Sequence, residues 1–463
     1  MIKFGTDGWR GVIARDFTFD NVKIVSQAIS DCLHKQNRRS KKVVVGYDSR
    51  FLSKEFAKSA GLVFAANKIK VTLADRAVPT PVVSFHSLMG RYDLGIMITA
   101  SHNPAYFNGL KIKTHEGAAA DNSLTNRVEN LLYKSKPKYM EEEDAKKKGL
   151  FEIKNLGSSY VTFLKNFVDV KKIRSLNVKI LVDAMYGSGD KFVESALAKT
   201  KIKIDYLRNE FNPSFGGIHP EPVAENLREL IVRVKRGKYD LGIALDGDAD
   251  RIAVVDKSGN LINAQVILPL LAIHMVKNRK EIGGIGKTVV GSSLIDKVAL
   301  ALGVPCYETP VGFKYISNLF KEDLICIGGE EAGGIGYRGY IPERDGSASF
   351  LLILEMCAAA KKSFGELLSA LYKQYGRYHY QRISLPLKSL KSTLDNLKLP
   401  SSLYGKKVER INTLDGIKLI TKDSWLMFRK SGTEPIVRVY AESRNKKEVD
   451  KLLSLGKKMI YAL

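Results

Sequence analysis

The chain has 463 residues, of which 44% are hydrophobic and 27% are charged, a balance typical of soluble globular proteins rather than of disordered or fibrous ones. Its length predicts three or four domains instead of one core. Lysine and arginine number 74 against 49 acidic residues, so the net charge is +25 and the chain attracts anions. No nucleic-acid recognition motif accompanies the charge, so we expect solvated surface lysines and no nucleic-acid partner.

The sequence carries no sign of export or of a membrane span. The first ten residues include Lys3, Asp7 and Arg10 and lack the apolar core of a secretory signal. The most apolar stretch, 350–360, is too short to cross a membrane. The four cysteines form no C-x-x-C pair, which favours free thiols in a reducing compartment. We therefore expect a cytoplasmic protein with no membrane partner, present as a monomer or a homodimer.

Apolar runs typical of buried parallel strands alternate with amphipathic helical patterns along the chain. The runs lie at 41–46, 93–98, 178–182, 240–245 and 324–327. Helical patterns cover 21–35 and 292–302, which predicts repeated βα units. The charged segment 134–148 is a candidate boundary or a solvated helix.

One short motif repeats. Tyr92-Asp-Leu-Gly-Ile96 recurs as Tyr239-Asp-Leu-Gly-Ile243, and a looser copy begins at Asp323. The residues eight positions beyond the shared aspartate are Ser101, Asp248 and Glu331. In parallel α/β sheets ligands collect beyond the carboxyl ends of strands. The repeat therefore predicts related α/β domains whose loops face one shared cleft.

The first of these loops is Thr99-Ala-Ser-His-Asn-Pro104. Ser101 at a strand end, flanked by His102 and followed by Lys111, is a candidate nucleophile or phosphate carrier. Histidine and lysine are donors that neutralise a phosphoryl group and move its protons. An ordinary turn would have the same composition, so the serine alone does not decide between them.

The second loop, Asp246-Gly-Asp-Ala-Asp-Arg251, points to a metal. Alternating aspartates aim several carboxylates at one place, and hard oxygen ligands select Mg²⁺ or Ca²⁺. An EF-hand is excluded, because Arg251 stands where that motif needs glycine and Lys257 where it needs glutamate. A loop with only three carboxylates leaves positions open for a phosphate, which suits Mg²⁺.

Two further loops offer substrate contacts. Gly328-Gly-Glu-Glu-Ala-Gly-Gly334 places carboxylates among glycines, where they can accept from sugar hydroxyls. Arg429-Lys-Ser-Gly-Thr-Glu-Pro435 is either a phosphate cradle or a hairpin with an exposed charge. Arg10, among glycines, and Lys314 are additional candidates for a phosphate.

In this order the four loops resemble those of the α-D-phosphohexomutase family, from Phe4–Gly11 to Arg429–Pro435. The resemblance implies an α/β fold of three topologically similar domains with mixed sheets, plus a smaller α+β C-terminal domain, around a central cleft. We expect the domains at 1–150 with the phosphoserine loop, 151–256 with the metal loop, 257–370 with the sugar loop and 371–463 with the phosphate loop.

The resemblance also implies roles for the residues. Ser101 is the phosphoserine, and one Mg²⁺ is held by Ser101, Asp246, Asp248 and Asp250. Arg251 and Lys111 neutralise the transferring group, and Lys111 and His102 are candidates for acid–base duty. The expected substrate contacts are Arg10, Lys314, Glu330, Arg429, Ser431, Gly432 and Thr433.

The function expected from this resemblance is a phosphohexomutase that interconverts hexose 1-phosphate and hexose 6-phosphate. The sugar is glucose or mannose, the intermediate is a hexose 1,6-bisphosphate, and the bisphosphate also serves as activator. A phosphoglucosamine mutase is the alternative. Ala332 stands where the family often has a serine that holds a sugar hydroxyl, and this difference leaves the sugar preference open. Two alternatives come from other functional classes. One is a phosphatase that uses Asp246 as nucleophile, and the other is a basic nucleic-acid-binding protein.

Overall fold

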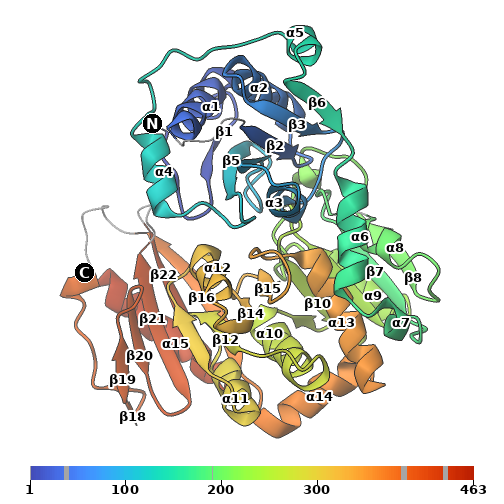
Figure 1. The fold of residues 1–463 in the computed structure, drawn as a ribbon. Helices are drawn as coiled ribbons and strands as arrows, with labels where there is room; N and C mark the ends of the chain where they lie inside the picture. The colour runs from blue at the N-terminus through green and yellow to red at the C-terminus, as the bar shows by residue number, and fades with distance from the viewer. Residues whose placement is uncertain (1, 36–40, 190, 387–393, 431–435, 463) are drawn as a thin grey trace.

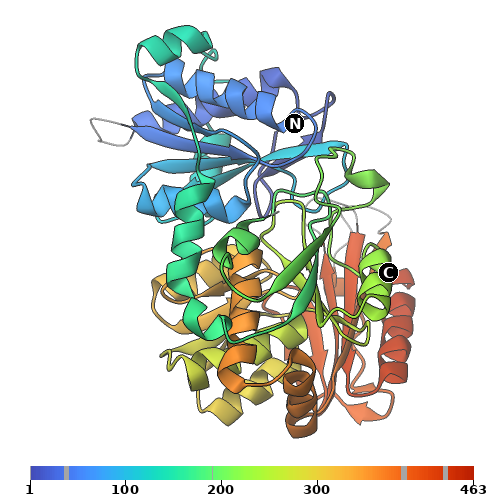
Figure 2. The ribbon, with the colours of Figure 1, turned by 90° about the vertical axis from the view of Figure 1, so that its right-hand side faces the viewer.

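The computed structural model describes residues 2–35, 41–189, 191–386, 394–430 and 436–462 (Figure 1). Within them, four sheets of four to six strands follow one another along the chain, with a two-stranded ribbon near the end. The first sheet and its helices lie at one end of the molecule, and the other three sheets lie together at the opposite end (Figures 1 and 2).

The first sheet has six strands and is mixed. Its order is β1 (Trp9–Val12), β5 (Phe107–Thr114), β4 (Leu94–Ile98), β2 (Lys42–Tyr47), β3 (Lys70–Ala74) and β6 (Phe151–Lys154). Its helices are α1 (Phe19–His34), α2 (Ser53–Ala66), α3 (Thr80–Met89), α4 (Asn122–Glu129) and α5 (Glu142–Lys147). The charged segment at 134–148 thus contains α5, a short helix of which only Ala145 is buried.

The second sheet has five strands, in the order β11 (Leu261–Ile262), β10 (Ile252–Asp256), β9 (Leu241–Leu245), β7 (Lys179–Asp183) and β8 (Lys203–Leu207). The helices of this part are α6 (Gly157–Phe167), α7 (Val170–Ile173), α8 (Phe192–Ala196) and α9 (Arg228–Arg236), with a 3₁₀ turn at Phe215–Gly217. The first sheet runs past the boundary expected at 150, because β6 pairs with β3, and the second runs past 256 through β11.

The third sheet has four strands, in the order β13 (Cys306–Thr309), β12 (Gly284–Thr288), β14 (Ile325–Gly329) and β15 (Ile335–Tyr337). Its helices are α10 (Ala264–Ile273), α11 (Ser293–Leu302), α12 (Phe313–Lys321), α13 (Gly346–Ala360) and α14 (Phe364–Tyr375), with a π-helical turn at His274–Asn278.

The last sheet is antiparallel, in the order β16 (His379–Pro386), β22 (Ile436–Ser443), β21 (Ser424–Lys430), β20 (Ile417–Ile420) and β19 (Arg410–Asn412). Helix α15 (Lys446–Tyr461) packs against β22 and β16. A 3₁₀ turn at Leu394–Asn396 and the ribbon of β17 (Ser402–Leu403) with β18 (Lys406–Lys407) precede β19.

Sequence patterns account for these elements. The continuous apolar run Val43–Val45 is fully buried because β2 lies inside the sheet between two parallel neighbours. Helices α1 and α11 begin where Thr18 and Ser292 accept hydrogen bonds from the backbone two to three residues on. The predicted strands and the two predicted helices are all present, shifted by at most two residues at their ends.

The first three sheets share one connection that places the site. In each, a strand with a parallel partner, β4, β9 or β14, leaves the sheet through a polar loop. The chain then returns as an antiparallel neighbour, β5, β10 or β15. The predicted fold class, three similar mixed α/β units followed by a smaller α+β unit, is confirmed.

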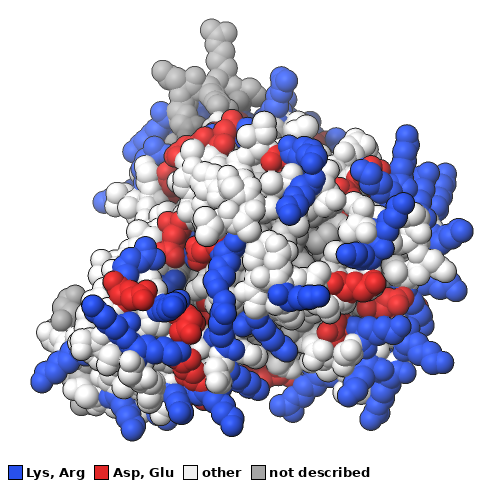
Figure 3. All heavy atoms as spheres, turned by 90° about the horizontal axis from the view of Figure 1, so that it is seen from below, with Lys and Arg blue, Asp and Glu red and all other residues white. Residues whose placement is uncertain are grey.

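One apolar core runs through the first three units, and a smaller cluster of Val289, Val290, Trp425, Met427 and Tyr440 joins the third sheet to the last. Lysine and arginine are spread over the face seen from below and are interspersed with acidic residues (Figure 3). None of the helices in the described part of the chain is both long and apolar enough for a membrane crossing.

Candidate active site

Three loops that follow equivalent strands meet between the first three sheets. Loop 99–106 follows β4, loop 246–251 follows β9, and loop 330–334 follows β14. The hydroxyl of Ser101 donates a hydrogen bond of 3.1 Å to Oδ2 of Asp246, and both side chains are fully buried. The serine and the acidic turn that the repeat assigned to one cleft are therefore in direct contact.

A buried arginine shapes the loop that carries Ser101. The guanidinium of Arg50 donates, at 2.5–3.1 Å, to the carbonyl oxygens of Ser101, Asn103, Pro104 and Phe107. Its Nε pairs with Asp48 at 3.1 Å. Ser101 has a φ of 53°, in the left-handed region that costs energy for a residue with a side chain. The hydrogen bonds of Arg50 hold the loop in this turn.

The acidic turn approaches the serine loop closely. A Cβ on Gly247 would lie 2.6 Å from the carbonyl oxygen of Ser101, so a larger residue there would separate the two loops. Ser49, which follows β2, links the first unit to the second at another place, because its hydroxyl donates to the carbonyl of Tyr186, which follows β7, at 2.6 Å. The two loops are thus fixed to one another by backbone contact.

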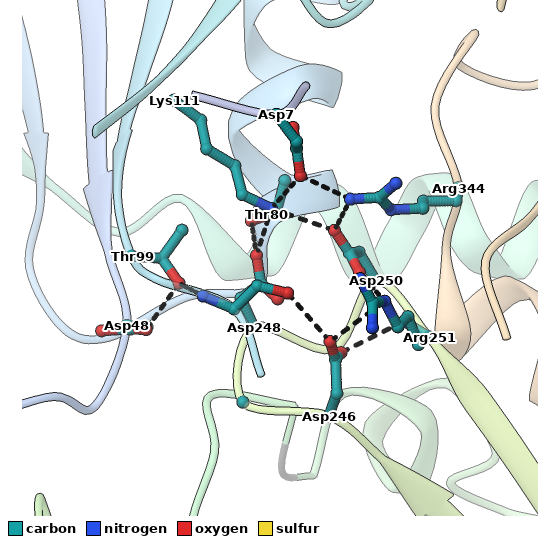
Figure 4. Close-up of polar contacts among 12 residues, drawn as sticks. Asp7, Asp48, Thr80, Thr99, Lys111, Asp246, Asp248, Asp250, Arg251 and Arg344 are labelled. Carbon is teal, nitrogen blue, oxygen red and sulfur yellow. Dashed lines mark hydrogen bonds and ion pairs between the residues drawn. The ribbon is translucent and has the colours of Figure 1, made fainter. Parts of the chain in front are cut away.

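The three aspartates of the turn are arranged as a cation site (Figure 4). One oxygen from each of Asp246, Asp248 and Asp250 lies within 4.8 Å of the others, and all three side chains are fully buried. The Oδ1 atoms of Asp248 and Asp250 have no hydrogen-bond partner. Buried carboxylate oxygens without partners are costly, and a hard divalent cation would satisfy them. The residues therefore fit Mg²⁺.

The pKa shifts of these aspartates are consistent with a cation between them. Burial, together with Asp250 and Asp248, raises the pKa of Asp246 well above its usual range. Burial would also raise the pKa of Asp248, but Lys111 and the hydrogen bond from Thr80 outweigh it, and this pKa is lowered. A cation among the carboxylates would relieve the repulsion that affects Asp246.

Lys111 supplies the positive charge on the other side of the turn (Figure 4). Its Nζ donates to Oδ2 of Asp248 at 2.8 Å and to Oδ2 of Asp250 at 3.1 Å, and it pairs with Asp7 at 2.8 Å. Burial would lower the pKa of Lys111, but the surrounding carboxylates raise it above its usual value. The lysine is therefore charged, and it contacts the Oδ2 atoms of Asp248 and Asp250, whose Oδ1 atoms have no hydrogen-bond partner.

Arg251 and His102 line the same place. The Nε of Arg251 lies 3.7 Å from Asp246 and 3.8 Å from Asp250, and it makes no hydrogen bond. Burial, with Arg251 and Arg10 nearby, lowers the pKa of His102 well below its usual value. The neutral imidazole has a buried Nδ1 without a partner. Both groups keep an atom free for a ligand.

Arg344 links the third loop to the acidic turn. Its guanidinium donates to Glu330 at 2.9 Å and to Asp7 at 2.5 Å, and it pairs with Asp250 at 2.8 Å. Burial raises the pKa of Glu330, although Arg344 opposes this shift. One arginine thus joins carboxylates of three different units, and it brings Glu330, the neighbour of the Glu331 that the repeat singled out, to the acidic turn.

The remaining predicted contacts are more dispersed. Arg10 lies at the serine loop, where its Nη1 donates to Asn103 at 2.6 Å. Lys314 donates to Asn122 at 2.7 Å, and Arg429 pairs with Asp415 at 2.8 Å, so neither side chain is directed at the acidic turn. Ser431, Gly432 and Thr433 lie outside the described residues.

Sequence reasoning missed Asp7, Thr80 and Arg344 as members of the site. The hydroxyl of Thr80 donates to Oδ2 of Asp248 at 2.5 Å. Each of the three lies in a sequence typical of a turn: Asp7 in the glycine-rich opening segment, Thr80 between two prolines, and Arg344 beside Asp345-Gly346. The sequence thus predicts turns at these places, but the contacts of these side chains with other units become visible only in the structure.

Known proteins resemble the chain along nearly its whole length. Models of the phosphoglucomutase/phosphomannomutase α/β/α domains I, II and III match residues 1–138, 158–259 and 263–375, and the model of the C-terminal domain matches 387–454. The phosphoglucosamine/phosphogalactosamine mutase of Sulfurisphaera tokodaii is 32% identical over 99% of this chain and 98% of its own length.

A phosphoglucomutase/phosphomannomutase of Thermococcus kodakarensis is 30% identical over 99% of this chain and 98% of its own. The crystal structure of a protein assigned as a phosphomannomutase, from Thermus thermophilus, matches with a TM-score of 0.88 and 33% identity over 99% of both chains. The chain belongs to the phosphoglucomutase/phosphomannomutase family, and it is a phosphohexomutase.

Proposed function

We propose that the chain interconverts the 1-phosphate and 6-phosphate of a hexose by passing a phosphoryl group through Ser101. The observation that carries this proposal is the 3.1 Å contact between the Ser101 hydroxyl and Asp246, beside a charged Lys111. Phosphoryl transfer depends on positioning and on charge neutralisation, and these groups provide both.

In the proposed cycle, the phosphorylated Ser101 donates its phosphoryl group to the free hydroxyl of a hexose phosphate. The bond from phosphorus to Oγ of Ser101 breaks, a bond to the sugar oxygen forms, and the sugar hydroxyl loses its proton. A divalent cation on Asp246, Asp248 and Asp250, joined by a Ser101 phosphate oxygen, would neutralise charge on the transferring group. The hexose 1,6-bisphosphate then reverses its orientation and returns its other phosphate to Ser101.

The electrostatics favour separate roles for the two acid–base candidates. A lysine that remains charged is suited to neutralise the phosphoryl group, and Arg251 joins it in that role. The neutral His102, with its unpartnered Nδ1, is suited to accept the proton of the sugar hydroxyl. Glu330 would hold sugar hydroxyls, and Arg10, Lys314, Arg429 and residues 431–433 would bind the phosphate that does not react.

Replacement of Ser101 by alanine tests the phosphoryl carrier. We expect Ser101→Ala to lose conversion of glucose 1-phosphate to glucose 6-phosphate, measured with a coupled dehydrogenase. Ser59→Ala is the matched control, because its hydroxyl is buried in α2 without a partner. The wild type should carry an acid-stable phosphate in its intact mass, and the Ser101 variant should not. Full activity of Ser101→Ala would refute the proposal, and an aspartyl phosphate would favour the phosphatase.

We propose glucose or mannose as the sugar and glucosamine as the second candidate. The names of the relatives support both, since one is a phosphoglucomutase/phosphomannomutase and another a phosphoglucosamine/phosphogalactosamine mutase. Ala332 offers no hydroxyl to the sugar. The 1-phosphates of glucose, mannose and glucosamine, compared by kcat/KM with hexose 1,6-bisphosphate as activator, separate the candidates. If kcat/KM for glucosamine 1-phosphate were well above the values for the glucose and mannose 1-phosphates, glucosamine would become the first candidate.

A further inference from the structure

The amino-terminal end of α3 touches the middle of the acidic turn. Thr80 is the first residue of this helix, and its backbone N–H donates to the carbonyl oxygen of Asp248 at 3.0 Å. The first N–H groups of a helix have no partner within the helix. Pro79 and Pro81 have no N–H at all, so Thr80 offers the one backbone donor of this tripeptide.

The side chain of the same threonine holds the other end of Asp248 (Figure 4). Its hydroxyl donates to Oδ2 at 2.5 Å, and Lys111 donates to the same oxygen at 2.8 Å. Oδ1 is left without a partner. Thr80 is fully buried, and its branched side chain has few rotamers, so the hydroxyl is fixed in place.

The contact crosses the boundary between two sheets. Thr80 lies in the first unit and Asp248 in the second, and they are separated by 168 residues of sequence. Asp246 is held differently, by the backbone N–H of Arg251 within its own turn and by Ser101. The orientation of Asp248 therefore depends on how the first unit docks on the second.

We infer that Thr80 is a positioning residue for the acidic turn, which fixes Oδ1 of Asp248 toward the cation and thereby sets the affinity of the enzyme for Mg²⁺. The inference rests on the proposed cation site. Groups that orient a metal ligand from behind typically change metal affinity 10- to 100-fold when they are lost. Without the hydroxyl, Lys111 alone would orient the carboxylate.

The test compares Thr80→Val, which keeps the shape but removes the donor, with Thr80→Ser, which keeps the donor. Titration calorimetry of the dephosphorylated full-length enzyme with MgCl₂ should give a Kd at least about tenfold higher for Thr80→Val. Thr80→Ser should bind close to wild type. In kinetics, the half-saturating Mg²⁺ concentration should rise for Thr80→Val, while KM for the hexose phosphate at saturating Mg²⁺ stays unchanged.

Thr288→Val is the control, since its hydroxyl is buried in the third sheet without a partner, and it should bind Mg²⁺ as the wild type does. Equal Kd values for wild type and Thr80→Val would overturn the inference. A wild type that binds no Mg²⁺ would instead refute the cation site and leave no role for Thr80. If Thr80→Val does not fold, Thr80→Ala takes its place in the same comparison with Thr80→Ser.

Discussion

Only one of the two carboxyl oxygens of Asp248 has a hydrogen-bond partner, and this difference leads to a prediction for the residue. Oδ2 is hydrogen-bonded, while Oδ1 is buried and unpartnered. Asp248→Asn keeps the shape but removes the charge. We expect turnover to fall at least about 100-fold and the required Mg²⁺ concentration to rise, because even a lost partner behind a ligand can cost that much. A coupled assay against Mg²⁺ concentration measures both.

The matched control for this change is Asp144→Asn, an aspartate exposed on α5. It should leave turnover and the Mg²⁺ dependence unaltered. If Asp248→Asn kept the Mg²⁺ requirement of the wild type, the assignment of Asp248 as a ligand would be wrong.

At the scale of a single strand, β20 carries a buried lysine into the junction with the third sheet. The Nζ of Lys418 donates to the carbonyl of Val289 at 2.6 Å and lies 4.5 Å from the ring centre of Trp425. Burial lowers its pKa from 10.5 to about 8. Between these values the unfolded chain holds a proton that the folded chain has lost, so this lysine makes stability rise with pH.

The prediction is a comparison of wild type with Lys418→Met. Between about pH 8 and pH 10, the free energy of unfolding of the wild type relative to the variant should increase by about 1.4 kcal/mol per pH unit. Urea unfolding followed by tryptophan fluorescence measures it, because one of the two tryptophans is Trp425 at this junction. A difference that stays constant or falls with pH would contradict the lowered pKa.

Elements and loops differ in how far their sequence predicts them. The strands β2, β4, β7, β9 and β14 were predictable, because burial on both faces demands continuous apolar runs. Ser101 and the three aspartates were predictable because each lies within a few residues of such a strand end. Arg344 and Asp7 were not, since their contact joins residues 337 positions apart and exists only once the sheets have docked.

At the scale of the whole molecule, a buried ion pair joins the first unit to the third, in addition to the pair of Asp7 with Arg344. Lys113 on β5 pairs with Glu343, and both side chains are almost fully buried. Lys113→Met leaves Glu343 buried without its cation and should cost about 3 to 5 kcal/mol of unfolding free energy. The double variant Lys113→Met/Glu343→Met should recover most of this loss, because no unpaired charge remains. Urea denaturation of the four proteins of the cycle measures the coupling.

Additive losses in the double variant would mean that the pair does not join the two sheets energetically. Lys146→Met is a control, since its pairing with Glu142 is at the surface of α5 and should contribute less than about 1 kcal/mol.

The assembly of the site from three loops that lie far apart in the sequence also has a consequence for biosynthesis. Ser101 leaves the ribosome long before its partner Asp246, which follows 145 residues later. At a synthesis rate of about 5 to 20 residues per second, the nascent serine loop waits roughly 7 to 30 seconds for the acidic turn. Arg344 emerges later still. A growing chain therefore cannot consume phosphosugars, and the reaction centre closes only when translation has passed the third of the sheets that build it.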